Sequence, residues 1–259
     1  MADRKLKIDI RRGKILEHLQ QSGKVLVSEL SEELSATPVT IRSDLDALQR
    51  DGYLVRVQGG AMAVSRAAAM PDCAVRSAER KAGEKRAIAA QCAGLIRSGD
   101  TLFINSGTTT QFLAAALSGH RNLNIVTNST AVAMELGAVA TFRVLLLGGE
   151  INASYGFTYG GDAQEQLSRY QADWAILSVD GISARGGITT YHAEEAVLDR
   201  MMLRSAKQGV ILADHSKIGR AGFSRICESQ PPIRLITDSQ CDPQAIDALR
   251  ECGLDVTVV

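Results

Sequence analysis

The sequence predicts an α/β protein of two domains, in which a small helical module with a short β-hairpin precedes a larger module built on a Rossmann-like parallel sheet. The chain has 259 residues, more than most single cores hold, since domains typically span roughly 100–200 residues. Helical periods and a glycine turn fill the first part of the chain, and from residue 84 onward short apolar runs alternate with helical segments. We therefore expect domains at residues 1–62 and 84–259, joined by a linker at residues 63–83 that shows no clean period.

The composition is that of an ordinary globular protein, with 45% hydrophobic and 22% charged residues. Because 29 Lys and Arg balance 29 Asp and Glu, a protein that coats nucleic acid or membrane indiscriminately is disfavoured. Local positive charge does cluster at the start of the chain, where six basic residues face only Asp3 and Asp9: Arg4, Lys5, Lys7, Arg11, Arg12 and Lys14. We interpret this cluster as a basic arm that contacts phosphates, with a solvated helix face as the alternative.

The cysteines and histidines give no sign of a metal site. Five cysteines are scattered without a C-x-x-C pair, and the four histidines lack metal-ligand spacing, so we expect no disulfide framework, metal or cofactor. Each histidine is expected at the surface or in a loop: His18, His120, His192 and His215. The chain opens without a signal-peptide pattern, and no apolar run approaches the ~20 residues that span a bilayer. The sequence therefore predicts a cytoplasmic protein with no membrane partner.

Three helices are predicted in the first module. The first runs from Ile8 to Gln21 and ends at Ser22-Gly23, as a helix stopped by glycine does. Ser28 is expected to cap a second short helix from Glu29 to Leu34. Thr37-Pro38 then starts the third helix, because a hydroxyl N-cap precedes proline at the first helical position. This helix continues to about Arg50, and an apolar stripe docks it on the other two: Ile41, Leu45 and Leu48.

The other side of the third helix is left for a partner. Three residues point away from the stripe and two flank it at the amino-terminal end: Val39, Ser43 and Arg50, and then Thr40 and Arg42. A recognition helix presents its amino-terminal residues to base edges, and a guanidinium pairs bidentately with guanine. Arg42 is therefore the first candidate for a base contact. A contact to a phosphate alone, or to Asp46 one turn later, remains an equal alternative.

An extended run from Tyr53 to Val57, a Gly59-Gly60 turn and a second run from Ala61 to Val64 predict a two-stranded wing. The module is therefore expected to be a winged helix-turn-helix that binds double-stranded DNA. The predicted DNA contacts lie on the helices and near the tip of the wing: Ser28, Thr37, Thr40, Arg42, Ser43, Arg50, Arg56 and Gln58.

With these motifs, the segment from Val27 to Ala61 resembles the DeoR family of sugar-metabolism regulators. Family members typically read Thr-Ile-Arg-Arg-Asp-Leu where this chain has Thr40-Ile41-Arg42-Ser43-Asp44-Leu45, followed by Gly52 and by Gly59-Gly60-Ala61. Ser43 departs from this pattern and removes one positive charge. The resemblance therefore implies an operator-binding protein in which phosphate attraction or the DNA sequence that is read differs at this position.

The second module contains seven short apolar runs that predict parallel strands: Thr101–Ile104, Asn124–Thr127, Arg143–Leu147, Trp174–Val179, Val210–Ala213, Leu235–Thr237 and Asp255–Val259. Ligands of open parallel sheets bind beyond the carboxyl ends of the strands. The first strand leads into Asn105-Ser106-Gly107-Thr108-Thr109-Thr110 and then a helix, an arrangement that suits a phosphate cradle, although a capped helix start is the alternative. The turn is neither a Walker motif nor a G-x-G-x-x-G turn, so nucleotide binding is disfavoured.

Polar or small residues also follow other strands, and together they suit an anionic, hydroxyl-rich ligand. The full predicted set is Asn105, Ser106, Gly107, Thr108, Thr109, Thr110, Thr127, Asn128, Ser129, Gly148, Gly149, Asp180, Gly181, Glu195, Asp214 and Lys217. This half resembles the DeoR-family effector domain, which is similar in fold to ribose-5-phosphate isomerase and glucosamine-6-phosphate deaminase. The family motifs Asp-x-Gly-Thr-Thr, Thr-Asn, Asp-Gly and Asp-x-Ser-Lys match the runs that begin at Asn105, Thr127, Asp180 and Asp214.

The resemblance has a specific implication at each of two residues of the second module. Asn105 departs from the family's aspartate, and because an amide can donate where a carboxylate only accepts, the ligand group at this position is implied to differ. Glu195 is implied to help close the pocket, with a solvated first turn of a helix as the alternative.

We expect a transcription regulator without catalytic residues that binds operator DNA as a homodimer or homotetramer. The resemblance implies a repressor of a carbohydrate-utilisation operon that a phosphorylated sugar relieves. One alternative is a sugar-phosphate isomerase-like or deaminase-like enzyme that carries a DNA-binding module, with Asp180, Glu195, Asp214 and Lys217 as acid and base groups. Another is an activator or nucleoid protein that senses no ligand.

Overall fold

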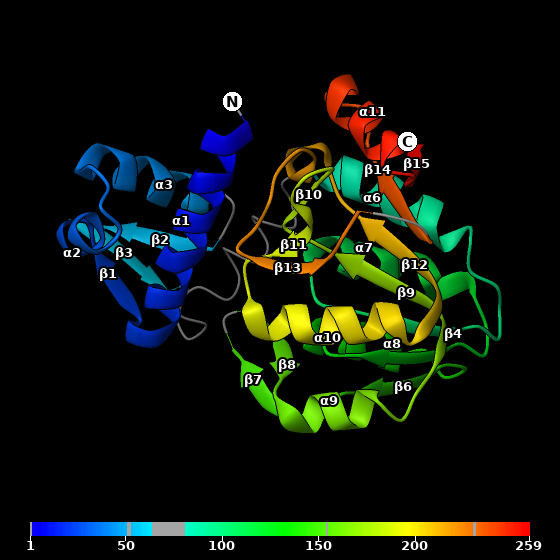
Figure 1. The fold of residues 1–259 in the computed structure, drawn as a ribbon. Coiled ribbons are helices and arrows are strands. Elements are labelled where there is room, and N and C mark those ends of the chain that lie inside the picture. The colour runs from blue at the N-terminus through cyan, green and yellow to red at the C-terminus, as the bar shows by residue number, and fades with distance from the viewer. Residues whose placement is uncertain (1, 51–52, 64–80, 154, 230–231) are drawn as a thin grey trace. The chain divides into compact units, whose positions relative to one another are not determined.

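The computed structural model describes residues 2–50, 53–63, 81–153, 155–229 and 232–259. The chain divides into two compact units, residues 1–80 and 81–259 (Figure 1). Most of the predicted linker at residues 63–83 lies outside the described residues, and the second unit begins at Lys81. Among the helices in the described ranges, none is long and apolar enough to cross a membrane.

The first unit alternates helices with short strands. Its elements are α1 (Ala2–Ser22), β1 (Lys24–Leu26), α2 (Val27–Glu33), α3 (Pro38–Arg50), β2 (Leu54–Val57) and β3 (Gly60–Ala63). The strands form an antiparallel sheet in the order β1-β3-β2, so the wing carries a third strand that the sequence analysis did not predict. Gly60 permits this pairing, because a Cβ at this position would lie 1.9 Å from the carbonyl oxygen of Val25.

The predicted core stripe of α3 is confirmed, since Ile41, Leu45 and Leu48 are fully buried. The predicted Thr37 cap is also confirmed, because the amide of Thr40 donates a hydrogen bond to Thr37 Oγ1 at 3.2 Å.

The predicted cap at Ser28 is wrong. α2 begins at Val27, so Ser28 lies inside its first turn and the N-cap is Leu26, which makes no side-chain cap bond. The physical reason is the extra strand, because β1 leads directly into α2 and the amide of Val27 donates to the carbonyl of Gly59 at 2.8 Å. The backbone of the wing turn therefore accepts the hydrogen bond of the Val27 amide, which no capping side chain reaches.

The second unit is built on a seven-stranded sheet in the order β15-β14-β12-β9-β4-β5-β6, with parallel pairing throughout. Its strands are β4 (Thr101–Ile104), β5 (Asn124–Thr127), β6 (Arg143–Leu146), β9 (Ala172–Ser178), β12 (Ala206–Leu212), β14 (Ile233–Thr237) and β15 (Asp255–Val258). All seven predicted strands are thus confirmed, with shifts of a few residues at some ends.

Helices cover both faces of this sheet, as a Rossmann-like fold requires (Figure 1). One core packs α6 (Ala82–Ala93), α7 (Thr108–Ala116) and α8 (Thr130–Gly137) against Leu102 and Ile104 of β4. The opposite core packs α9 (Gly161–Leu167), α10 (Ala193–Arg204) and α11 (Pro243–Glu251) around Phe103 and Leu177. Successive residues of β4 therefore point into different cores, as the period of a strand dictates.

Smaller elements gather after the sheet strands. β7 (Glu150–Asn152) and β8 (Phe157–Tyr159) form a hairpin, and β10 (Gly181–Ser183), β11 (Gly187–Thr190) and β13 (Ser224–Cys227) form a separate antiparallel sheet. Two 3₁₀ turns, Leu117–Gly119 and His215–Lys217, complete the described elements. None of these short strands of the second unit was predicted from the sequence.

Candidate DNA-reading surface and ligand site

The outer side of α3 is exposed as predicted. Val39 is 72% exposed, and Arg42 and Ser43 are also exposed, while Thr40 is half-buried. Val39, Arg42, Ser43 and Asp46 line a shallow, open depression on this surface. The first unit therefore presents a guanidinium, a hydroxyl and an apolar group together on an exposed part of α3.

Arg56 connects the wing to α3, a role that the sequence analysis did not predict. Its guanidinium forms an ion pair with Asp46 and donates to the carbonyls of Gly60 at 3.0 Å and Arg42 at 3.2 Å. Asp46 thus pairs with Arg56, and no ion pair among the described residues engages Arg42. The alternative in which Asp46 neutralises Arg42 is therefore not the arrangement of the structure.

Part of the basic arm has a structural role instead of facing a partner. Nε of Arg11 lies 2.5 Å from Asp44 Oδ2, and Nε of Arg12 lies 3.1 Å from Asp44 Oδ1. Asp44 is 2% exposed, so α1 and α3 are joined through a buried carboxylate. Lys14 is exposed, and the side chains of Arg4, Lys5 and Lys7 lie outside the described residues.

The other predicted DNA contacts lie on three elements. Ser28 is exposed on α2, Thr37 is exposed before α3, and Gln58 is exposed in the wing turn. The side chain of Arg50 lies outside the described residues. Contact between any of these residues and DNA remains a prediction.

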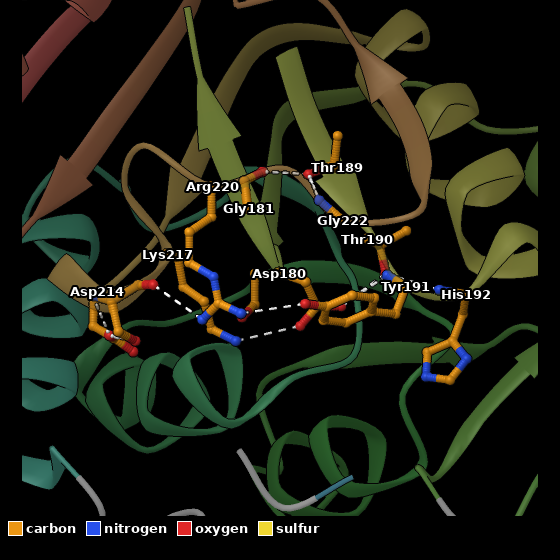
Figure 2. A network of polar contacts seen from close by, with 12 residues as sticks. Asp180, Gly181, Thr189, Thr190, Tyr191, His192, Asp214, Lys217, Arg220 and Gly222 are labelled. Carbon is orange, nitrogen blue, oxygen red and sulfur yellow. Dashed lines mark hydrogen bonds and ion pairs between the residues drawn. The ribbon is translucent and has the colours of Figure 1, made fainter. Parts of the chain in front are cut away.

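In the second unit, acidic and basic side chains meet where β9 and β12 end. Asp180 follows β9, and its carboxylate accepts hydrogen bonds from the amide of Tyr191 at 3.0 Å and from Thr190 Oγ1 at 3.1 Å. Nζ of Lys217 lies 3.4 Å from Asp180 Oδ1. Figure 2 shows Lys217 and Arg220 between Asp180 and Asp214.

Asp214, which follows β12, is held in its charged form. Nζ of Lys81 lies 2.8 Å from Asp214 Oδ1, and the amide and hydroxyl of Ser216 donate to the same oxygen. Burial alone would raise the pKa of Asp214, but the hydrogen bonds from Lys81 and Ser216 outweigh it and hold the pKa well below its usual range.

Lys85 completes a cluster of cations that we call the cation cluster: Lys81, Lys85, Lys217 and Arg220. Lys85 is buried, and burial lowers its pKa to about 8, with Lys217 and Lys81 adding to the shift and Asp214 opposing it. Arg220 donates to the carbonyl of Ser216 and to the hydroxyl of Tyr191, both at 3.3 Å. Of the four cations, only Lys217 was predicted from the sequence as a ligand residue. Lys81 is the N-cap of α6 and has a left-handed conformation, so no helical spacing in the sequence connects it with Lys85.

The turn after β4 packs tightly against β9. Gly107 has φ +143°, and a Cβ there would lie 2.6 Å from Cβ of Ser178, so this position excludes other residues. Thr108 begins α7 and is half-buried, whereas Thr109 and Thr110 are buried. Thr108 is therefore the least buried of the three threonines, while Thr110 donates to the carbonyl of Gly107.

Asn105 has a different environment from the one predicted. Its amide donates to the carbonyl of Ser178 at 2.9 Å and to Asp199 Oδ1 at 3.0 Å, and its oxygen accepts from the amide of Ser178 at 2.8 Å. Asn105 is fully buried, and both amide hydrogens are used within the protein. Its contact with a ligand remains a prediction, but the geometry assigns it to the joint between β4, β9 and α10.

Two buried carboxyl groups lie beside this joint. The carboxyl group of Glu195 is hydrogen-bonded to Ser106 Oγ and lies 3.3 Å from Thr190 Oγ1, whose own proton is directed to Asp180. Burial raises the pKa of Glu195 to about 8, and the charge of Asp180 adds to the shift. Burial, followed by the charge of Glu195, also raises the pKa of Asp199 well above its usual range. The alternative of a solvated Glu195 is therefore wrong, and burial favours the protonated form of both carboxyl groups.

The remaining predicted ligand residues brace loops. Ser129 caps α8, and the amide of Ser129 donates to Thr127 Oγ1 at 3.0 Å. Asn128 donates to the carbonyl of Thr158 in β8, while its Oδ1 has no partner among the described residues. Gly148 donates to Gln166 Oε1 at 2.9 Å.

Two glycines of the predicted ligand set are explained by close packing. At Gly149, which has φ +118°, a Cβ would lie 2.5 Å from the carbonyl oxygen of Tyr159. A Cβ at Gly181 would lie 2.8 Å from the carbonyl oxygen of Arg220. Ligand contact by these residues stays a prediction.

His192 lies in a loop, one of the two positions expected for it, but its side chain is buried. It lies in the loop before α10, is 6% exposed, and packs against Tyr155 and Phe157 with ring centroids 4.3 and 5.4 Å away. Burial lowers its pKa, so the imidazole is neutral at pH 7. Its Nε2 atom has no hydrogen-bond partner in the described part of the chain.

Family models match both halves of the chain. Residues 11–67 match the model described as a DeoR-like helix-turn-helix domain, and residues 80–239 match the DeoR C terminal sensor domain. The chain is 32% identical over 251 residues to a putative aga operon transcriptional repressor of Escherichia coli O157:H7, covering 96% of this chain and 93% of the relative. It is 36% identical over 215 residues to the glycerol-3-phosphate regulon repressor of Escherichia coli K12, covering 81% and 82%.

Solved structures resemble the chain more distantly. Ribose 5 phosphate isomerase A from Neisseria gonorrhoeae aligns with 51% of this chain and 52% of its own, at 16% identity and a TM-score of 0.39. That score is too low to support an inference about activity.

Proposed function

Because the chain belongs to the DeoR family of transcriptional regulators, we propose that it represses a carbohydrate-utilisation operon and is released when a phosphorylated sugar binds its second unit. The family consists of DNA-binding regulators and not of enzymes, so the isomerase-like or deaminase-like alternative falls away. Two relatives are named as repressors of an aga operon and of a glycerol-3-phosphate regulon, which supports both the repressor role and a phosphorylated ligand.

The cation cluster is the observation that carries the proposal. Four cationic side chains gather at the carboxyl ends of β9 and β12, and ion pairs within the described residues join Lys81 to Asp214 and Lys217 to Asp180. A phosphate dianion in this region gains charge-assisted hydrogen bonds from lysine and from helix amides. The buried, protonated Glu195 and the hydroxyl of Thr190 offer neutral partners for sugar hydroxyls.

Release requires that the ligand favour one arrangement of the DNA readers over the other, since equal affinity for both would change nothing. Lys81 suits this task because it is the first residue of the second unit and is ion-paired with Asp214. We assign it the coupling role, in which a bound phosphate competes with Asp214 for the ammonium. The contact between the ligand site and the start of α6, where the linker joins, then changes.

The way in which operator DNA is read determines the number of subunits. A single module reads one half-site, so the protein acts as a homodimer or homotetramer with its readers on two half-sites. Because operator DNA lies in the cytoplasm, the protein acts in that compartment.

A mobility-shift assay tests the proposal directly. The full-length protein is incubated with the DNA upstream of its own gene and titrated with a panel of sugar phosphates at fixed salt, because the affinity for DNA depends steeply on ionic strength. One sugar phosphate is expected to release the DNA, whereas the unphosphorylated sugar leaves it bound. Failure to bind this DNA and any sequence enriched from a random pool contradicts the proposal, as does DNA binding that no sugar phosphate alters.

A further inference from the structure

Val39 has the largest exposed fraction of any large hydrophobic side chain in the described part of the first unit, at 72%. Stability does not account for a valine there. A side chain that is 72% exposed buries little apolar surface, and a β-branched residue is a poorer helix former than alanine, glutamine or lysine. The residue type therefore points to a contact made outside the chain.

The surroundings of Val39 define the chemistry of that contact. Val39 lines the shallow depression on α3 together with Arg42, Ser43 and Asp46. Arg42 follows three residues later, and side chains at this spacing on a helix lie about 5–6 Å apart at their Cβ atoms. Asp46 is held by Arg56, so its carboxylate is directed to the wing. The surface thus offers one apolar group beside one guanidinium.

We infer that Val39 is a specificity-determining residue that contacts the C5 methyl group of a thymine beside the base pair that Arg42 reads. In the major groove, this methyl is the one apolar group among the hydrogen-bonding atoms of the base edges. Stacked bases are separated by about 3.4 Å, so two side chains that are neighbours on a helix can contact the same base pair or two adjacent base pairs. The inference rests on the proposed function, because it requires α3 to lie in the major groove of an operator.

The test removes the methyl group from either side of the contact. The full-length protein first selects a duplex from a randomised pool, and each thymine of one half-site is then replaced in turn by deoxyuridine, which lacks only the C5 methyl. One replacement is expected to weaken binding about three- to fivefold, the effect of losing one buried methyl group. Val39→Ala is expected to weaken binding to the unmodified duplex by a similar factor and to abolish the sensitivity to that replacement.

The controls separate this inference from the function on which it rests. Alanine favours the helix, so Val39→Ala is expected to fold, and its thermal unfolding checks this. Val55→Ala changes another exposed valine of the first unit, on β2, and its effect is expected to add to that of every uracil replacement. If no replacement weakens wild-type binding, or if Val39→Ala stays equally sensitive, the inference is wrong. If no duplex is enriched at all, the proposed DNA-binding function itself fails.

Discussion

The ammonium group of Lys81 lies 2.8 Å from Oδ1 of Asp214, so the residue that opens the second unit is paired with an acid at the end of β12. The partners are 133 residues apart in the chain. Lys81 has φ +56°, a left-handed conformation that costs a non-glycine residue energy and persists where its surroundings hold it. The pair therefore fixes the start of α6 to the residues that follow β12.

Lys81→Met is expected to bind operator DNA with near wild-type affinity and to respond more weakly to the sugar phosphate. Methionine keeps a long apolar stem but removes the charge for which Asp214 and the ligand compete. The measurement is the ratio of DNA affinities with and without ligand, expected to fall at least fivefold. Lys207→Met is the matched control, because Lys207 lies 2.8 Å from Asp173 but is 78% exposed. An unchanged ratio in Lys81→Met contradicts the coupling role.

Arg42→Ala is expected to abolish the mobility shift, since a bidentate guanine contact supplies about 1–3 kcal/mol of discrimination. Arg42→Lys, which keeps the charge but loses the planar fork, is expected to retain weak binding with relaxed sequence preference. By contrast, Thr108→Ala at the start of α7 is expected to bind DNA normally and to lose the ligand response. If Arg42→Ala and Thr108→Ala both behave like the parent, both site assignments are wrong.

Asp44→Asn is expected to destabilise the first unit by about 1–3 kcal/mol, because Arg11 and Arg12 lose the buried charge that accepts their hydrogen bonds. The expected signature is a lower midpoint of thermal or urea unfolding, with weaker DNA binding at temperatures near that midpoint. Asp46→Asn is the control, because Asp46 is 60% exposed and an exposed pair contributes little. Equal stability of the two variants argues against a structural role for Asp44.

The free energy of unfolding of the second unit is expected to fall as the pH rises from about 4.5 to about 8. Burial raises the pKa of Glu195 from 4.5 to about 8, so the folded state binds more protons than the unfolded state across this window. Glu195→Gln removes the titration and is expected to flatten the slope of stability against pH in urea unfolding. Glu194→Gln, one residue earlier, is the control and is expected to keep the slope. A parent-like slope in Glu195→Gln would falsify the assignment.

Affinity for the sugar phosphate is expected to fall as the pH rises through about 8. Burial lowers the pKa of Lys85 to about 8, so the ammonium that attracts the phosphate loses its proton in this range. Calorimetric titration between pH 7 and 9 measures the effect. Lys85→Arg keeps its charge throughout, so its affinity is expected to vary less, and a parent-like decline in this variant contradicts the role of Lys85.

The parallel sheet was predictable because its inner strands, such as β4 and β5, are mostly buried and are therefore short, uninterrupted apolar runs. Thr101–Ile104 and Asn124–Thr127 have the predicted bounds. The strands of the smaller sheet escaped prediction because β10 and β11 are short and begin with glycine, a residue that weakens the strand signal. The glycines of these strands are explained by close contacts between loops, and such contacts are seen only in the folded chain.

The site was predictable only in part, for a related physical reason. Motifs at strand ends indicated Asp180, Asp214 and Lys217, because topology brings those ends together. The contribution of Lys81 depends on a partner far away in the chain, which no local pattern specifies. Asn105 was found by its motif, yet its hydrogen-bond partners on β9 and α10 direct it into the protein.

The clasp of Arg11 and Arg12 around Asp44 sets a condition for engineering this protein. A designer who transplants the recognition helix of another regulator, in order to redirect the protein to new promoters, also transplants whatever residue occupies position 44. Without an acid there, the two arginines of α1 would face each other with no counter-charge. A chimera therefore needs the first helix and the recognition helix exchanged as a matched pair.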